Sequence, residues 1–303
     1  MLALALIIDA LTGEPDAVWK RIPHPVVLMG RLVTILDEGL NHGPLRTLKG
    51  TAAVAILVAV VGAPALFLSI SLFGGLFEVL LAAVLLAHRS LVDHVGAVAK
   101  GLRKSLRQGR AAVAHIVGRE TREMDEPTVA HVAIESAAEN FSDGVVAPAF
   151  WFLVAGLPGI AIYKAVNTAD SMIGHRTERY EAFGWAAARL DDLMNWVPAR
   201  LAGLVIALAG SGWEAVETMR RDAVLHRSPN AGWPEAAMAA SLGIALGGPR
   251  TYAGVPSDDA WLNAGATAVP RPEDIDRCVS VLWRAWLALV VIAAALWTLA
   301  WLL

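Results

Sequence analysis

Polar side chains recur at intervals of four residues in the segment HVAIESAAENFSD. On an α-helix, His131, Glu135, Glu139 and Asp143 would form a stripe along one face. Carboxylates at this spacing repel each other by roughly 0.2–0.5 kcal/mol per pair, unless a cation or a basic ligand lies between them. Mg²⁺ suits such a position because it binds carboxylates together with substrate phosphates. We therefore predict that Glu139 and Asp143 bind Mg²⁺, with a solvated acidic face as the alternative.

A second group of polar residues follows an apolar stretch. The segment KAVNTADSMIGHR places amide, acidic, hydroxyl and imidazole side chains at steps of three and four, so they share a helical face. The segment RLDDLMN adds two aspartates and an asparagine. Side chains of these types bind metals, hydroxyls and amines, although a structural hydrogen bond explains the imidazole equally well. The residues are Asn167, Asp170, Ser171, His175, Asp191, Asp192 and Asn195.

The composition indicates that these polar residues lie in an integral membrane protein. The 303 residues are 56% hydrophobic and 17% charged, with a mean hydropathy of +0.53. Ionisable groups near lipid are costly and therefore indicate function. The net charge of −3 gives no support for a nucleic-acid-binding surface. We predict an all-α, polytopic protein with about four to five membrane-embedded helical segments, amphipathic cytoplasmic helices and a single domain over 1–303.

The apolar stretches predict where the chain enters the membrane. Residues 279–303 form the clearest span, because their length suffices to cross about 30 Å of hydrocarbon. Residues 51–87 are too long for one ordinary span and contain two adjacent glycines, so we predict a hairpin of two short antiparallel helices. Residues 196–210 form a further short apolar segment, whereas residues 211–278 are more polar.

The apolar segment 145–166 is interrupted near its middle by Gly156 and Pro158, which would weaken a straight membrane helix. As one kinked span, it would place residues 131–143 and 167–195 on opposite sides of the membrane. As a re-entrant hairpin, it would place them on the same side. We favour the hairpin, because broken apolar helices at membrane depth commonly frame a polar cavity.

Lys and Arg residues flank the predicted 51–87 hairpin on both sides, which predicts that both flanks are cytoplasmic. Residues 88–130 are predicted to form amphipathic helix with basic residues on its polar side. We favour a solvated charged face for that side, with contact to anionic lipid head groups as the alternative. Cys278 is the only cysteine, so an internal disulfide is excluded and we expect a packed thiol. The N-terminal segment MLALALIIDALTGEP lacks a basic region and a small-residue cleavage site, so we expect it to be retained.

Three segments carry a resemblance to a known family. ESAAENFSDGVVAPAFW, YKAVNTADSMIGHRTERYEAFGWAAARLDDLMNWVPARL and SPNAGWPEAAMAASLGIALGG resemble the CobD/CbiB family of cobalamin-biosynthesis membrane proteins. The segment DALTGEPDAVWKRIPHPVVLMG is similar to the opening pattern of that family, in which Asp, a Gly-acid-Pro turn and His-Pro-Val precede Gly. Glu14 stands where that pattern more often has Asp. The resemblance extends over nearly the whole chain.

The resemblance implies adenosylcobinamide-phosphate synthase activity. In that reaction, ATP is used to join the free propionate of adenosylcobyric acid through an amide to (R)-1-aminopropan-2-ol or its O-phosphate. The carboxylate must be activated, most simply as an acyl phosphate, and phosphoryl transfer requires Mg²⁺ and charge compensation. The amine must lose a proton to a carboxylate or an imidazole, and His131, His175 and His24 are the candidate imidazoles.

The polar residues divide into those expected to act in catalysis and those expected to bind substrate. Lys164, Arg176 and Arg179 are placed to meet phosphate groups, although membrane anchoring explains such residues equally well. The predicted catalytic residues are Glu135, Glu139, Asn140, Asp143 and His175. The predicted substrate-binding residues are His24, Lys164, Asn167, Asp170, Ser171, Arg176, Asp191, Asp192 and Asn195.

ATP would have to bind at an unfamiliar site, because the chain has neither G-x-x-x-x-G-K-[ST] nor G-x-G-x-x-G.

Two other functions compete with the ligase. An intramembrane prenyl or alcohol-phosphate transferase would hold Mg²⁺ with similar Asp and Asn clusters, and a secondary transporter would use broken helices and buried acids. The resemblance further implies a multi-pass protein of the bacterial inner membrane, with a cytoplasmic active region and other late cobalamin-pathway membrane enzymes as candidate partners.

Overall fold

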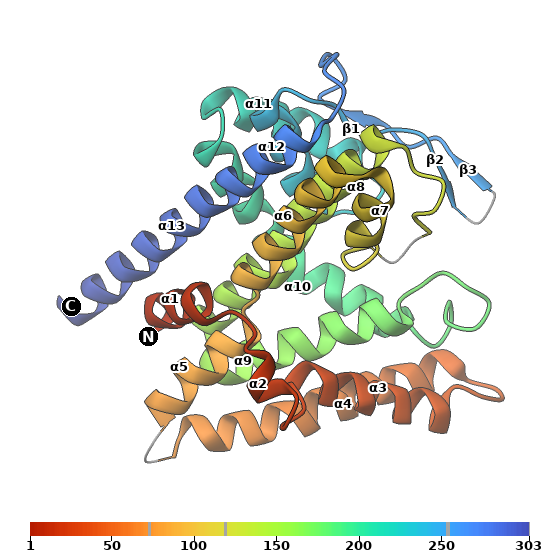
Figure 1. The fold of residues 1–303 in the computed structure, drawn as a ribbon. Helices are drawn as coiled ribbons and strands as arrows, with labels where there is room; N and C mark the ends of the chain where they lie inside the picture. The colour runs from red at the N-terminus through yellow and green to blue at the C-terminus, as the bar shows by residue number, and fades with distance from the viewer. Residues whose placement is uncertain (72–73, 118–119, 253–254, 303) are drawn as a thin grey trace. The chain divides into compact units, whose positions relative to one another are not determined.

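A computed structural model describes residues 1–71, 74–117, 120–252 and 255–302 (Figure 1). Its regular structure is almost entirely helical, which confirms the all-α prediction, and the strands of the described residues are short antiparallel pairs. The chain divides into two compact units, each built from two separate stretches of sequence, so a single domain stays a prediction. Unit 1 comprises Met1–Ala87 and Ala147–Trp196, and unit 2 comprises His88–Val146 and Val197–Leu303.

Five helical stretches of the described residues are long and apolar enough to cross a membrane, as predicted for a polytopic protein. Each apolar segment predicted from the sequence overlaps at least one of them. The helices extend beyond the apolar residues into polar sequence, which hydropathy alone does not reveal. The stretches are Arg46–Ser69, Gly75–Lys104, Glu126–Ile173, Trp185–Ala209 and Pro272–Ala300.

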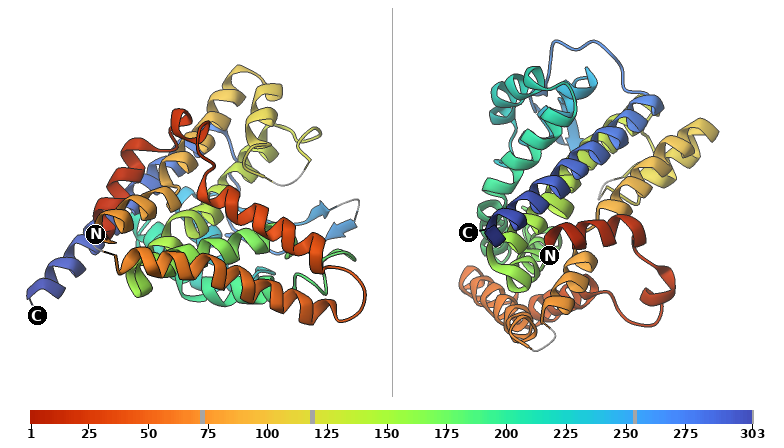
Figure 2. Two further views of the ribbon diagram at one scale, coloured as in Figure 1. Left: turned by 90° about the horizontal axis from the view of Figure 1, so that it is seen from below. Right: turned by 90° about the vertical axis from the view of Figure 1, so that its left-hand side faces the viewer.

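Unit 1 is a group of helices in which α4 packs against α3, α5 and α9, and α1 packs against α5. Helices α3 and α4 lie side by side in each view (Figure 2). The contact between α4 and α5 agrees with two helices over residues 51–87, although the second candidate span continues to Lys104. The helices are α1 (Leu2–Thr12), α2 (Asp16–Trp19), α3 (Pro25–Leu40), α4 (Arg46–Ser69), α5 (Gly74–Leu85), α9 (Ala147–Ile173) and the first part of α10 (Trp185–Ala209).

Helix α9 contains a reversal of the chain at Ala155 and Gly156. Ala155 has φ −139° and ψ 19°, and Gly156 has φ 61° and ψ −149°, a conformation that favours glycine. A Cβ atom added at Gly159 would lie 2.2 Å from the carbonyl oxygen of Trp151. In a straight helix these two residues would be about 12 Å apart along the axis. The two halves therefore fold back on each other, as the hairpin alternative for 145–166 predicts.

Unit 2 combines helices with two short strand pairs. Strand β1 (Leu246–Gly247) pairs with β4 (Trp261–Leu262), and β2 (Arg250–Tyr252) pairs with β3 (Val255–Ser257), both antiparallel. These strands lie in the segment that the sequence marked only as polar. The helices are α6 (His88–Lys104), α7 (Leu106–Val113), α8 (Glu126–Phe141), a π-helix (Ser142–Val146), the second part of α10, α11 (Trp213–Asp222), a 3₁₀ turn (Ala223–Leu225), α12 (Gly232–Leu242) and α13 (Pro272–Leu302).

The amphipathic segment 88–130 forms α6, α7 and the start of α8. Ser105 separates the first two helices by accepting a hydrogen bond from the backbone N–H of Gln108 at 3.3 Å, as an N-cap does. The apolar side of α6, including Val95 and Val98, is buried, and α6 packs against α7, α8 and α13. The apolar side of α6 therefore packs against protein, and both interpretations of its basic side stay predictions.

Helix α13 begins at Pro272, seven residues before the predicted span, and has 31 residues. Its first half packs against α6 and α8, where the buried ring of His88 stacks on Trp286 with a centroid distance of 5.5 Å. Cys278 is fully buried, as expected. The second half is mostly exposed and apolar, with Trp297 and Leu302 among its exposed side chains. This half provides the lipid-facing surface that the sequence predicted.

Candidate functional site

A buried chain of hydrogen bonds in unit 1 joins α9 to α10. The hydroxyl of Tyr163 donates to Asn195 Oδ1 at 3.0 Å, and Asn195 Nδ2 donates to Asp191 Oδ2 at 3.0 Å. Asn167 Nδ2 donates to the other carboxylate oxygen, Asp191 Oδ1, at 3.3 Å. Asp191 and Asn195 are one helical turn apart and both are buried. Two predicted asparagines, one from each motif, therefore meet around the carboxylate of Asp191.

Asp170 adds a second carboxylate to this group, because it lies close enough to Asp191 to interact with it electrostatically. A Cβ atom at Gly174 would lie 1.9 Å from Asp170 Oδ1, so only glycine leaves room for this carboxylate. Neighbouring carboxylates repel each other, and a cation between them relieves the repulsion. The arrangement is suited to binding a metal ion or a substrate ammonium group.

The remaining residues predicted in this part of the chain lie around that group. Arg189 forms an ion pair with Asp192 at 3.6 Å, and Arg176 also interacts with Asp192 electrostatically. The hydroxyl of Ser171 donates to the backbone carbonyl of Asn167 at 2.9 Å. His175 is exposed in the loop between α9 and α10. The structure does not bring His175 into the buried hydrogen-bonded group.

His24 has a structural role at the start of α3. Its Nδ1 accepts a hydrogen bond from Val26 N at 3.2 Å, and its Nε2 contacts the carbonyl oxygen of Val84 at 3.2 Å. Nε2 is therefore the protonated nitrogen of a neutral imidazole. Burial lowers the pKa of His24, although Glu14 and Val84 oppose the shift. Because both ring nitrogens of His24 are hydrogen-bonded to the protein backbone, the imidazole is not free to accept a proton from substrate. Lys164, another predicted substrate-binding residue, interacts electrostatically with His24.

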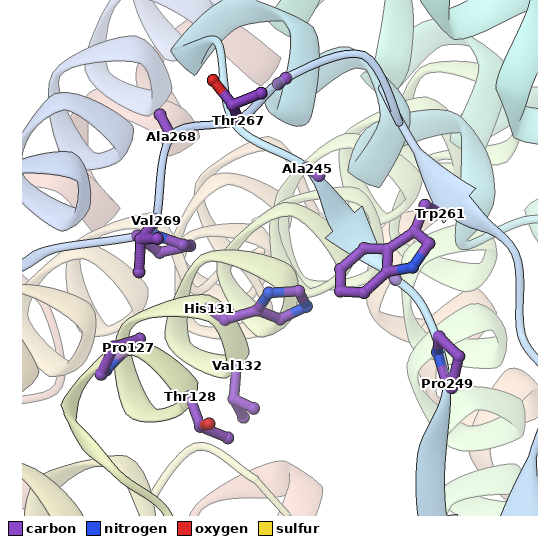
Figure 3. A pocket seen from close by; sticks show the side chains of 13 residues that line it. Pro127, Thr128, His131, Val132, Ala245, Pro249, Trp261, Thr267, Ala268 and Val269 are labelled. Atoms are coloured by element: carbon purple, nitrogen blue, oxygen red, sulfur yellow. The ribbon is translucent and has the colours of Figure 1, made fainter.

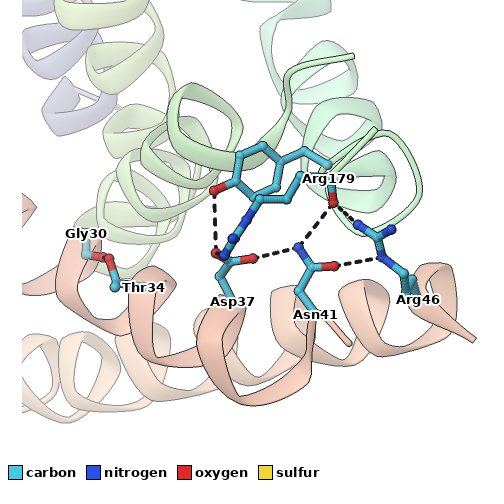
Figure 4. A network of polar contacts seen from close by, with 7 residues as sticks. Gly30, Thr34, Asp37, Asn41, Arg46 and Arg179 are labelled. Atoms are coloured by element: carbon cyan, nitrogen blue, oxygen red, sulfur yellow. Dashed lines mark hydrogen bonds and ion pairs between the residues drawn. The ribbon is translucent and has the colours of Figure 1, made fainter. Parts of the chain in front are cut away.

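A polar network that sequence reasoning missed holds the loop before α10 (Figure 4). Arg179 pairs with the buried carboxylate of Asp37 at 2.6 Å, and Asn41 Nδ2 donates to the same carboxylate at 2.7 Å. Asn41 and Arg46 also bond backbone carbonyls of the loop. The hydrogen bond and charge of Asp37 raise the pKa of Arg179. The guanidinium of Arg179 therefore neutralises Asp37, and binding of phosphate by Arg179 stays a prediction.

The sequence did contain one signal of this network. Asp37 and Asn41 are four residues apart on α3, in the segment ILDEGLNHG, so their side chains lie on one face. Their partner on the loop is 142 residues away from Asp37 in the chain. A sequence pattern at short range cannot identify such a partner.

His131 and Glu135 form a pair in unit 2 at the wall of a cavity of about 370 Å³. His131 Nε2 lies 2.9 Å from Glu135 Oε1, and the same oxygen accepts the backbone N–H of Gly247 at 2.8 Å. Glu135 is only 4% exposed. Figure 3 shows the imidazole of His131 directed toward the indole of Trp261, whose ring centroid is 6.1 Å away. The buried carboxylate thus orients an imidazole that lines the cavity.

The polar residues predicted on α8 are buried at Glu135 but exposed one turn later. Glu139 and Asn140 are exposed, and Asn140 Nδ2 donates to the backbone carbonyl of Ser136 at 2.8 Å. Asp143 lies in the π-helix, whose wider turn rotates it out of a regular i, i+4 stripe. Within the described residues, no group of three or more His, Cys, Asp or Glu side chains forms a site for a metal ion. Mg²⁺ binding by Glu139 and Asp143 stays a prediction.

Comparison with known proteins decides the family. The chain matches the CobD/CbiB protein family over residues 2–282. The chain belongs to the CobD/CbiB family. The cobalamin biosynthesis protein CobD of Rhizobium meliloti (strain 1021) is 51% identical over 94% of this chain and 92% of its own length. The proteins of the same name from Rhodobacter capsulatus and Brucella suis are 50% and 47% identical, over 98% of this chain and 98% and 96% of their own lengths.

No solved structure matches this chain. In this CobD/CbiB protein, the motifs that carry the family resemblance contain Glu135 and the polar group around Asp191. ESAAENFSD contains Glu135, which holds His131, and the longer central motif contains the residues around Asp191. His131 lies four residues before the first motif, so its place beside Glu135 comes from the structure.

Proposed function

We propose that this CobD/CbiB protein is an adenosylcobinamide-phosphate synthase. It would use ATP to join the free propionate of adenosylcobyric acid to (R)-1-aminopropan-2-ol or its O-phosphate through an amide bond. Membership in a family whose members are named for cobalamin biosynthesis supports a corrinoid substrate. The observation that carries the ligase proposal is the His131–Glu135 pair at the cavity wall, because an ammonium substrate must lose a proton before it attacks an activated carboxylate.

The hydrogen bonds of Glu135 determine which nitrogen of His131 would act as the base. Glu135 Oε1 accepts from Gly247 N, so it serves as a carboxylate acceptor, and His131 Nε2 is the protonated nitrogen that donates to it. Nδ1 then carries the lone pair. A carboxylate that holds an imidazole in one tautomer and stabilises its protonated form is a common arrangement in proton-transfer sites. His131 Nδ1 accepts the proton that the amine loses as the C–N bond forms.

Two pairs of carboxylates are suited to bind cations in this proposal. Asp170 and Asp191 in unit 1 interact electrostatically, and Glu139 and Asp143 in unit 2 are four residues apart in the sequence, on α8 and on the π-helix that follows it. Mg²⁺ commonly binds one or two carboxylates and completes its shell with water and substrate phosphates, so a pair is sufficient. When bound, Mg²⁺ would compensate the charge of the transferred phosphoryl group.

The membrane location supports the same proposal. The helices long enough to cross a bilayer indicate an integral membrane protein, and the basic residues before α4 and along α6 and α7 favour a cytoplasmic position for these segments. ATP would then be available on the side of the membrane that holds the basic residues. We expect a multi-pass protein of the bacterial inner membrane.

The proposal is tested with purified protein in detergent. Adenosylcobyric acid, Mg-ATP and either aminopropanol or its phosphate are supplied, each is omitted in turn, and corrinoid products are identified by mass spectrometry. We expect an amide product that requires ATP and shows which amine is used. No product with either amine, from protein that elutes as a single folded species, would refute the ligase and favour a transferase or a transporter.

A further inference from the structure

A cavity of about 550 Å³ lies beside the start of α3, within unit 1. The chain between α1 and α3 forms most of its wall, and the first turns of α3 form the rest. The volume lies within the range of roughly 300–1,000 Å³ that is typical of small-molecule sites. The lining residues are Glu14, Trp19, Lys20, Arg21, Ile22, Pro23, His24, Val27 and Arg31.

Cationic side chains outnumber the acidic one in this cavity. Lys20, Arg21 and Arg31 are exposed there, and Glu14 is the carboxylate among the lining residues. Within the described part of the chain, neither Arg21 nor Arg31 forms an ion pair or a side-chain hydrogen bond, whereas Arg179 in the same unit is paired with Asp37. Guanidinium groups match phosphate with paired hydrogen bonds. The cavity therefore has positive charge that the protein itself does not neutralise.

The wall that carries these cations is fixed by backbone and ring contacts. Arg21 N and Ile22 N both donate to the carbonyl oxygen of Val18, at 2.9 and 3.0 Å. The ring of Trp19 meets the ring of His24 edge to face, with centroids 4.5 Å apart. His24 in turn bonds both the start of α3 and Val84. A preformed wall reduces the ordering cost of binding a ligand.

We propose that this cavity binds the phosphate groups of a nucleoside triphosphate. The inference rests on the proposed function, because ATP is the triphosphate that the ligase consumes. Three cations suit the charge of a polyphosphate, and the indole of Trp19 offers an apolar surface for a base. A site built from side chains of a loop and a helix would also explain how the chain binds nucleotide without a glycine-rich phosphate loop. A lipid headgroup phosphate shares this chemistry, and the experiment separates the two.

The test compares the double variant Arg21→Gln/Arg31→Gln with the wild type. Arg107→Gln is the matched control, because Arg107 is also an exposed arginine but lies on α7, outside the cavity. Binding of a non-hydrolysable Mg-ATP analogue is measured by calorimetry in detergent without anionic lipid. We expect the double variant to bind at least about tenfold more weakly, and the control to bind within about twofold of the wild type. Equal affinity of the double variant and the wild type would overturn the site.

Two further measurements identify the ligand and distinguish a failure of the proposed nucleotide site from a failure of the ligase proposal. In nanodiscs, variants that lose phosphatidylglycerol binding but keep the wild-type affinity for the analogue would overturn the nucleotide assignment in favour of a lipid headgroup. Where amide product forms, the double variant should raise the KM for ATP about tenfold with little change in kcat. Amide formation with an unchanged KM overturns the cavity and leaves the ligase intact. Binding of the analogue at the cavity without amide product leaves the site intact and overturns the ligase.

Discussion

Replacing Glu135 by Gln tests the proposed base most directly. The carboxylate accepts hydrogen bonds from His131 and from the backbone of Gly247, and it is almost fully buried. A glutamine preserves the shape, but its neutral oxygen forms weaker bonds and its NH₂ group can donate to His131 Nε2. That donation would favour the tautomer protonated at Nδ1, which has no lone pair for the amine.

The expected loss of stability follows from these two hydrogen bonds. Hydrogen bonds to a charged group contribute about 1.5–3 kcal/mol and neutral ones about 0.5–1.5 kcal/mol, so Glu135→Gln should lower the free energy of unfolding by about 2 kcal/mol. Loss of general base catalysis should lower kcat by about 10²- to 10⁴-fold. The KM for ATP should be unchanged, since the substitution removes no group from the proposed nucleotide site.

The assay measures amide formation by mass spectrometry and the unfolding midpoint in the same detergent. Glu123→Gln is the control, because Glu123 is an exposed acid in the turn before α8. It should leave both quantities close to those of the wild type. An E135Q enzyme with wild-type kcat would refute the role of His131 as the base, even if the protein were less stable.

Three further predictions follow from other contacts. Gly174→Ala would place a Cβ atom 1.9 Å from Asp170 Oδ1, so it should displace that carboxylate and lower kcat at least about tenfold; an active variant would contradict a role for Asp170. Arg179→Gln removes the ion pair of the buried Asp37 and should lower the midpoint of thermal or denaturant unfolding; an unchanged midpoint would contradict it. Burial places the pKa of His24 below its unfolded value of 6.5, so the unfolded chain binds more protons in acid. The stability that neutral His24 contributes is therefore present above about pH 6.5 and is lost as the pH falls toward the lowered pKa. A His24→Asn variant should show a smaller loss of unfolding midpoint between pH 8 and pH 5 than the wild type, and equal slopes would contradict the assignment.

Short-range spacing predicted the parts of the site that lie on a single helix. His131 and Glu135, and likewise Asp191 and Asn195, are four residues apart and do bond to each other. Hydropathy predicted the apolar cores of the membrane helices for a similar reason, since it depends only on neighbouring residues. The chain reversal in α9 was foreseeable because Gly156 and Pro158 interrupt an otherwise apolar run.

The contacts that sequence reasoning missed join residues far apart in the chain. Glu135 bonds the backbone of Gly247, which is 112 residues away, and a backbone N–H carries no signature in the sequence. Tyr163 reaches Asn195 because α9 reverses and packs beside α10, a consequence of tertiary structure. The ion pair between Arg179 and Asp37 could not be predicted either, because the two residues are 142 positions apart in the chain. The short strand β1 was also unpredictable, since two residues give no periodic pattern.

The length of α13 determines where the cavity beside His131 lies with respect to lipid. About 20 residues suffice to cross a bilayer, so a helix of 31 residues extends about 16 Å beyond the hydrocarbon. Pro270, on the cavity wall, precedes the start of this helix by two residues. An unbroken helix acts as a rigid spacer, so a bilayer around its C-terminal part would leave the cavity beyond the headgroup layer, which is about 5–8 Å thick on each side. A water-soluble molecule would then reach the cavity without entering the bilayer.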